Sequence, residues 1–107
     1  MVHEELSGEI IGAAMTVLNT LGPGLDEKLY ERALVIELRR RGHQVEQQKS
    51  FPVEYHGEPI GHLVPDLIVD GLVIADPKVA EAFHDTHLRQ MLGYLAITKL
   101  KLALLLR

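Results

Sequence analysis

Apolar residues in the first part of the chain recur at the three- and four-residue spacing of amphipathic helices. The positions are Ile10, Ile11, Ala14, Val17, Leu18 and Leu21, and then Leu29, Ala33, Leu34 and Leu38. Gly22 and Pro23 end the first segment, residues 5–21. The second segment, residues 26–40, is followed by Gly42, and glycine commonly terminates helices. We therefore predict two helices whose apolar faces lie in the core.

The middle of the chain instead contains short apolar and β-branched runs bounded by turn residues, which is the pattern of strands. The runs are residues 45–49, 51–55, 63–69 and 72–75. Residues 56–59 and 70–71 have turn chemistry, so we predict a mostly antiparallel sheet. Helical spacing returns from His84 to about Thr98, and residues 100–106 close the chain as an apolar strand. This order predicts an α/β (α+β) fold in a single domain, residues 1–107.

Composition agrees with one small core. The 107 residues are 47% hydrophobic and 5% aromatic, which predicts aliphatic packing between helices and sheet. Cysteine is absent, so disulfides and thiolate zinc sites are excluded, and no apolar run reaches the ~20 residues of a membrane span. These features predict a soluble, cytoplasmic protein. The net charge of -4 argues against a general basic clamp for nucleic acid, so metal ions would have to supply part of the positive charge.

Two carboxylates and a lysine stand on neighbouring strands of the predicted hairpin. Asp76 and Lys78 share one face of their strand because side chains alternate, and Pro77 points to the other face. A two-residue loop at residues 70–71 would place Asp66 and Asp76 on opposite faces. A three-residue loop or a bulge would bring both carboxylates and the lysine to the same side, and we predict such an odd loop.

This set of residues is typical of metal-dependent hydrolysis of phosphodiesters. Two carboxylates and a backbone carbonyl, completed by waters, form the hard-oxygen shell that Mg²⁺ and Mn²⁺ prefer. Such an ion lowers the pKa of a bound water and neutralises charge on the phosphate, while Lys78 orients the nucleophile or stabilises the transition state. The alternative is that the aspartates are only solvated strand ends. The short D-x₉-D-x-K spacing by itself leaves both interpretations open.

Further motifs along nearly the whole chain are similar to those of one family. They are, in chain order, a helix ending in Leu-Gly-Pro-Gly, the G-x-x-E-x-x-Y of Gly24, Glu27 and Tyr30, a Pro-Asp, an acid-x-Lys, and the H-x-x-Q-x-x-x-Y of His87, Gln90 and Tyr94. Between about residues 5 and 106 the chain thus resembles the GxxExxY proteins of the PD-(D/E)XK nuclease superfamily. Five ordered motifs are specific where each alone is weak.

The resemblance implies a restriction-endonuclease-like core, with a mixed sheet of about four to five strands flanked by helices. It also implies a nuclease that depends on Mg²⁺ or Mn²⁺, with DNA favoured over RNA as the substrate. The implied metal ligands are Asp66, Asp76, the Pro77 carbonyl and Glu27. The implied catalytic residues are Lys78, Asp76 and Asp66, and the implied substrate-binding residues are Gln90, Tyr94, Tyr30 and His87.

Two positions depart from the family pattern. Pro77 stands where similar sequences usually carry an apolar residue, and because it has no N–H we expect it at an edge or a bulge. Val64 stands where many relatives have an arginine, and losing that cation would weaken substrate binding or indicate a different substrate. Together with the acidic charge, these departures favour an alternative in which the fold is a catalytically inactive binding or dimerisation module. The short chain and its apolar closing strand are compatible with a homodimer.

Overall fold

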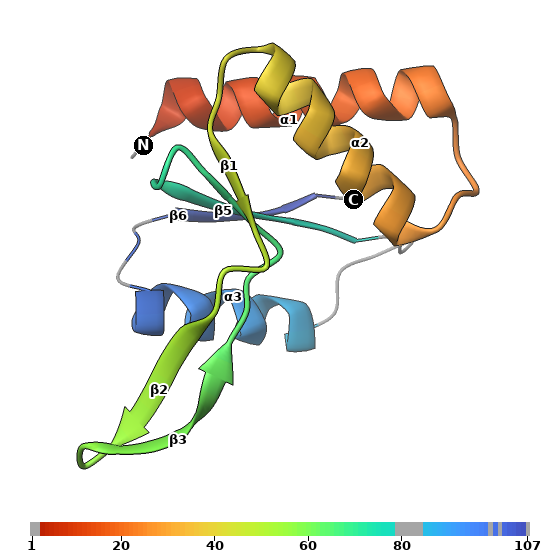
Figure 1. Ribbon diagram of the computed structural model, residues 1–107. Coiled ribbons are helices and arrows are strands. Elements are labelled where there is room, and N and C mark those ends of the chain that lie inside the picture. Colours follow the sequence, from red (N-terminus) through yellow and green to blue (C-terminus); the bar gives the residue numbers. More distant parts are fainter. Residues whose placement is uncertain (1–2, 79–84, 99, 101, 107) are drawn as a thin grey trace.

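The computed structural model describes residues 3–78, 85–98, 100 and 102–106. Within them the chain forms three helices, α1 (Glu4–Leu21), α2 (Glu27–Arg40) and α3 (Asp85–Thr98). The same residues form six strands (Figure 1), which are β1 (Val45–Gln47), β2 (Phe51–Tyr55), β3 (Glu58–Leu63), β4 (Leu67–Val69), β5 (Val73–Pro77) and β6 (Leu102–Leu106). The helices lie where the apolar spacing predicts them, although His84, the predicted start of the third, is outside the described residues. No helix in these ranges is long and apolar enough to cross a membrane.

A four-stranded mixed sheet forms the centre of the fold, with the strand order β1-β4-β5-β6. Strands β1 and β5 run antiparallel to β4, whereas β6 runs parallel to β5. A parallel pair needs a crossover connection, and α3 lies in that connection. Helices α1 and α2 cover one face of the sheet and α3 covers the other (Figure 1). The predicted α+β fold is confirmed, and the arrangement is consistent with a restriction-endonuclease-like core.

Each face of the sheet has its own apolar core. Side chains alternate along β4 and β5, so odd-numbered residues face α1 and α2 while even-numbered residues face α3. The first core contains Ile10, Ala13, Leu34, Val35, Leu38, Val45, Leu67, Val69, Val73 and Ala75. The second contains Ile68, Ile74, Met91 and Tyr94. Because both faces are covered, the two strands appear in the sequence as continuous apolar runs.

The turn between β4 and β5 has the odd length that the sequence predicts. Val69 pairs with Val73, which leaves a loop of three residues, 70–72. The first two loop residues adopt left-handed φ angles of 53° and 67°. Continuing the register beyond β4 places Asp66 opposite Asp76. The prediction is confirmed, and both carboxylates lie toward the α3 face.

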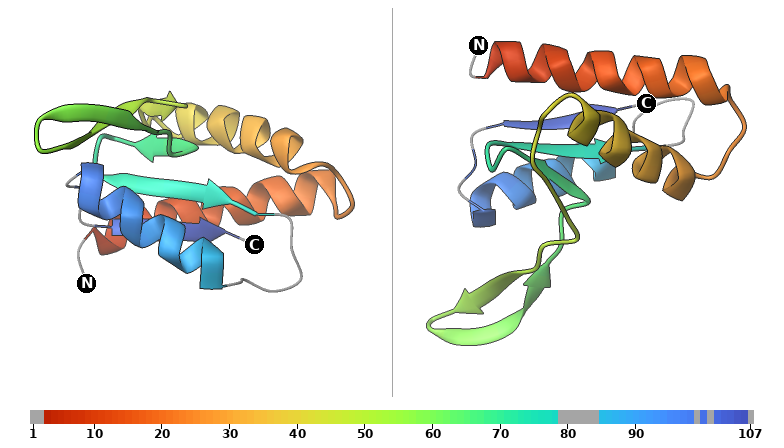
Figure 2. Two further views of the ribbon diagram at one scale, coloured as in Figure 1. Left: turned by 90° about the horizontal axis from the view of Figure 1, so that it is seen from below. Right: turned by 45° about the horizontal axis from the view of Figure 1, so that its top comes forward.

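Strands β2 and β3 form a separate hairpin, which we call the arm (residues 51–63). Among the described residues they pair only with each other, and the arm projects from the body of the protein past α3 (Figure 2). The prediction of one strand over residues 63–69 is therefore wrong. The chain leaves the ladder between β3 and β4, where Pro65 has no N–H to donate. At the other connection Gln48 has a left-handed φ of 54°, which turns the chain out of β1.

Helix α2 ends in a Schellman motif, as the glycine predicts. Gly42 has a left-handed φ of 92°. Its N–H donates to the carbonyl of Arg39, and the N–H of His43 donates to the carbonyl of Leu38, both at 3.0 Å. This ending directs His43 back toward α1 and the β4–β5 turn.

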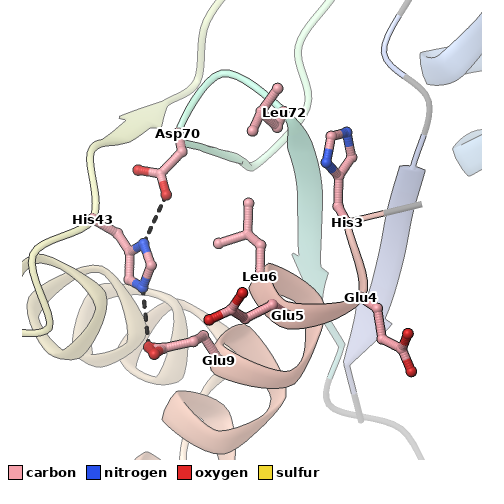
Figure 3. Close-up of a pocket in the computed structure, with 8 residues that line it drawn as sticks. All are labelled: His3, Glu4, Glu5, Leu6, Glu9, His43, Asp70 and Leu72. Atoms are coloured by element: carbon pink, nitrogen blue, oxygen red, sulfur yellow. Dashed lines mark hydrogen bonds and ion pairs between the residues drawn. The ribbon is translucent and has the colours of Figure 1, made fainter. Parts of the chain in front are cut away.

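His43 joins three elements of the fold beside a cavity of about 440 Å³ (Figure 3). Its Nδ1 lies 2.7 Å from a carboxylate oxygen of Asp70, and its Nε2 lies 3.1 Å from a carboxylate oxygen of Glu9. Hydrogen bonds to Glu9 and then to Asp70 raise the pKa of the imidazole, although burial opposes them. Burial by itself would raise the pKa of Asp70, but hydrogen bonds from His43 and the Gln44 N–H lower it. We call this set of three side chains the His43 clasp.

Candidate active site

Asp66 and Asp76 meet at the end of the β4–β5 hairpin opposite its turn. Asp66 directly precedes β4, and Asp76 lies near the end of β5 with only 1% of its surface exposed. One carboxylate oxygen of Asp76, Oδ1, is buried and has no hydrogen-bond partner among the described residues. A buried carboxylate oxygen without a partner is costly. The geometry is therefore suited to an added positive charge, either a proton or a cation.

The pKa of Asp76 likewise favours an added proton or cation beside Asp66. Burial first, and then hydrogen bonding and repulsion from Asp66, raise the pKa of Asp76 from 3.8 to about 8, although Lys78 opposes the shift. Asp76 therefore keeps a proton at neutral pH in the metal-free protein. A divalent cation bound by the two carboxylates would displace that proton, because metal ligands must be deprotonated.

Lys78 and Pro77 complete this end of β5. The Nζ of Lys78 lies 3.4 Å from Oδ2 of Asp76, and 18% of the lysine side chain is exposed. The two side chains thus share a face, as strand alternation predicts. Pro77 is the last residue of β5 and pairs with Leu106 on one side, while the pairing with β4 has already ended at Ala75. A proline is tolerated at such a strand end because few ladder hydrogen bonds remain to be made there.

Comparison with known families agrees with this geometry. The family model described as the PD-(D/E)XK nuclease superfamily matches residues 4–107. The chain belongs to the PD-(D/E)XK nuclease superfamily. No curated protein and no solved structure matches the chain. Membership supports a nuclease-like function and a nucleic-acid substrate in general.

Superfamily nucleases typically use divalent metal ions, and the residues in this protein fit such an ion. Carboxylate and carbonyl oxygens are hard donors that suit Mg²⁺ and Mn²⁺. In the described part of the chain, no three side chains of His, Cys, Asp or Glu form a group that could hold a metal. The protein side of the shell would therefore consist of Asp66, Asp76 and backbone carbonyl oxygen, with waters completing it.

A buried glutamate that the sequence analysis missed lies close to the acids. Glu31 of α2 is 5% exposed. The Nε2 of Gln48 lies 3.4 Å from a carboxylate oxygen of Glu31 and 3.5 Å from one of Asp66, and the Nζ of Lys28 lies 3.1 Å from the other Glu31 oxygen. The signal was present in the sequence, because Glu31 precedes Leu34 by three residues and so lies on the apolar face of the helix. A charged residue on that face requires a polar partner.

Tyr94 of α3 lies near the acids on the opposite side. It is 7% exposed, and its hydroxyl lies 3.5 Å from the carbonyl of Val64. Burial raises the pKa of the Tyr94 hydroxyl, and the charges of Asp76 and Asp66 raise it further, so the phenol stays neutral. Gln90 and His87 lie four and seven residues earlier on the same helical face. Gln90 is exposed and His87 is partly exposed, and their roles in substrate binding remain predictions.

The two remaining candidates lie at the start of α2. The hydroxyl of Tyr30 donates to the carbonyl of Gly22 at 2.6 Å and accepts from the N–H of Leu25 at 3.1 Å. Both hydrogen bonds fix the loop between α1 and α2, and the substrate-binding role of Tyr30 stays a prediction. Glu27 is exposed, and its role as a metal ligand is likewise a prediction. Of the predicted site residues, Lys78 contacts Asp76 directly, and Asp66 lies close enough to raise the pKa of Asp76.

Proposed function

We propose that this protein is a Mg²⁺- or Mn²⁺-dependent phosphodiesterase that hydrolyses nucleic acid, with DNA favoured over RNA. The observation that carries the proposal is the environment of Asp76. Its carboxylate is buried beside Asp66, one of its oxygens has no partner among the described residues, and the other lies 3.4 Å from Nζ of Lys78. Burying Asp76 beside a second acid and a lysine is costly for a structural role alone, and the arrangement matches the requirements of phosphodiester hydrolysis.

Each residue of the site has a distinct role in this mechanism. Asp66, Asp76 and the carbonyl of Pro77 would hold the metal ion, with Glu27 assisting through waters. When bound, the ion supplies positive charge to the phosphate and lowers the pKa of a water. Lys78 orients the attacking water and stabilises the negative charge that develops on the phosphate oxygens. Because Lys78 already contacts Asp76, its ammonium group is held in place before substrate arrives.

Helix α3 carries most of the residues that we propose bind the substrate. Gln90 and Tyr94 correspond to a Q-x-x-x-Y element, and Tyr94 lies close enough to the acids for their charges to raise its pKa. We assign Gln90, Tyr94 and His87 to contacts with the nucleic-acid backbone, together with Tyr30 from α2. The G-x-x-E-x-x-Y motif supports placing the chain among the GxxExxY proteins of the superfamily.

The alternative is a catalytically inactive binding or dimerisation module, and it differs in what it requires of Lys78. An inactive module would not need Lys78 beside the acids, so this alternative predicts a displaced lysine. The 3.4 Å separation between Lys78 and Asp76 supports the active enzyme instead. The position of Pro77 at the end of β5, where ladder pairing runs out, also supports it, because the missing N–H disturbs little.

The test is a cleavage assay on single- and double-stranded DNA and RNA, with Mg²⁺, Mn²⁺ or a chelator. Wild type is compared with Lys78→Ala and with Arg40→Ala, a control that removes one positive charge from the exposed far end of α2. We expect metal-dependent cleavage that Lys78→Ala lowers by about 100-fold or more and Arg40→Ala leaves unchanged. Equal activity in wild type and Lys78→Ala, or no cleavage of any substrate, would refute the proposal.

A further inference from the structure

The arm of β2 and β3 starts at the candidate active site. Gln48, which precedes the arm, donates its backbone N–H to the carbonyl of Asp66 at 3.1 Å. Its side-chain Nε2 lies 3.5 Å from a carboxylate oxygen of the same aspartate. The arm therefore leaves the body between two connections that are hydrogen-bonded to each other at the acids. From there it projects past α3, the helix on the same face of the sheet as the acids (Figures 1 and 2).

One face of β2 continues from the core to the exposed tip of the arm. Phe51 packs against the core on the α3 side, and Val53 is half-buried. Tyr55 follows on the same face because side chains alternate, and it is 67% exposed. Its ring meets the ring of His56 edge to face, with the centroids 4.4 Å apart. Gly61 is the partner of Val53 and leaves open space beside this row of side chains.

The charges of the arm do not favour binding through phosphates. Among Asp, Glu, Lys and Arg, the arm contains only two glutamates, Glu54 and Glu58. Lys49 at its base already pairs with Glu46 at 3.3 Å. Duplex binding relies on positive charge along the phosphate backbone. Single strands add to their phosphate contacts the stacking of unpaired bases on exposed aromatic rings, and this stacking tolerates any base sequence. The exposed rings on an acidic arm therefore match a single strand better than a duplex.

We propose that the arm holds a single-stranded stretch of nucleic acid, with an unpaired base stacked on Tyr55 and His56. This inference rests on the proposed nuclease function, because the strand so held leads to the acids at the base of the arm. The backbone from Phe51 to Tyr55 spans about 13 Å at ~3.3 Å per residue, which equals the rise of about four stacked nucleotides. A substrate must be several nucleotides long to reach both the acids and the tip.

The experiment measures binding of a fluorescent single-stranded oligonucleotide by anisotropy, in the Lys78→Ala background so that the probe stays intact. Tyr55→Ala should raise Kd by about 5- to 150-fold, the effect of losing one stacked base. Tyr55→Phe keeps the ring and should bind as before. Ile60→Ala is the matched control, because Ile60 is also 67% exposed on the arm but has no aromatic face. Thermal unfolding checks that each variant is folded.

Several outcomes would overturn this inference. The first is unchanged affinity in Tyr55→Ala, and the second is an equal loss of affinity in Ile60→Ala. The third is a preference for duplex that depends on Tyr55. The fourth is a lower molecular mass of Tyr55→Ala than of the protein with Tyr55, measured by light scattering, with no change in affinity. The last would mean that the arm binds a second copy of the chain instead.

A parallel assay separates this inference from the nuclease proposal. Cleavage of a dinucleotide, which is too short to reach the tip, depends on the acids and Lys78 alone. Cleavage with no effect of Tyr55 on binding would refute only the role of the arm. Binding that depends on Tyr55 without any cleavage would refute only the nuclease. A wild type that neither binds nor cleaves would refute both.

Discussion

The substitution Asp76→Asn tests whether the candidate site is built around a suppressed negative charge. In the metal-free protein Asp76 keeps its proton and hydrogen-bonds to Asp66, because burial and its neighbour raise its pKa from 3.8 to about 8. Asparagine has nearly the same shape and also carries a donor that can reach Asp66. The variant therefore imitates the protonated aspartate at every pH. It should be at least as stable as wild type without metal, although it has lost a metal ligand.

The size of the effect follows from the pKa shift. A group whose pKa is higher in the folded state makes its full contribution to stability at pH values below its unfolded pKa. That contribution is lost as the pH rises through its folded pKa. The window here runs from about pH 4 to about pH 8. Each pKa unit corresponds to about 1.4 kcal/mol, so at pH 7 the cost of Asp76 is at most about 4 kcal/mol. We expect Asp76→Asn to be more stable than wild type by up to that amount at pH 7, and equal to it near pH 4.

The assay is urea unfolding followed by circular dichroism, in chelator, at several values between pH 4 and pH 8. The difference between variant and wild type is the quantity of interest, because groups distant from Asp76 titrate equally in both proteins. Asp26→Asn is the matched control, since Asp26 is exposed and its side chain makes no capping hydrogen bond. Added Mg²⁺ or Mn²⁺ should stabilise wild type and leave Asp76→Asn unchanged. A variant less stable than wild type at pH 7 in chelator, or a difference that does not grow with pH, would refute the reasoning.

Two further predictions concern residues outside the acid pair. His43→Gln should lower stability most near pH 5, because the clasp needs Asp70 ionised, above its unfolded pKa of 3.8, and His43 protonated, below its unfolded value of 6.5. The stability that wild type gains from the clasp should fade as the pH rises through the folded pKa of His43, and a pH-independent difference in urea unfolding would contradict this. Tyr30→Phe removes the hydrogen bonds to Gly22 and Leu25 and should cost about 1 to 2 kcal/mol in unfolding free energy. It should also raise KM, because the proposed function assigns Tyr30 to substrate binding. A loss of stability with KM unchanged would limit Tyr30 to fixing the loop between α1 and α2.

Local patterns in the sequence determined most of the elements and much of the site. Apolar spacing predicts α1 and α2 because helix periodicity is a property of neighbouring residues. Strand alternation places Asp76 and Lys78 on one face for the same reason. The turn at residues 70–71 had two possible lengths, and the chemistry of the acids favoured the odd one that the structure contains. Motifs along the whole chain identified the superfamily, because their order constrains a fold more than any single motif does.

Only the tertiary structure decided how these parts meet. Strand propensity alone predicted a continuous strand over residues 63–69, but the arm separates from the sheet at Gln48 and Pro65. Propensity could not show this, because pairing partners distant in sequence determine which ladder a strand joins. Glu31 became part of the acidic neighbourhood through Gln48, a contact between segments with no sequence link. The raised pKa of Asp76 depends first on its burial in the central sheet, and burial is a property of the assembled fold and not of the residue.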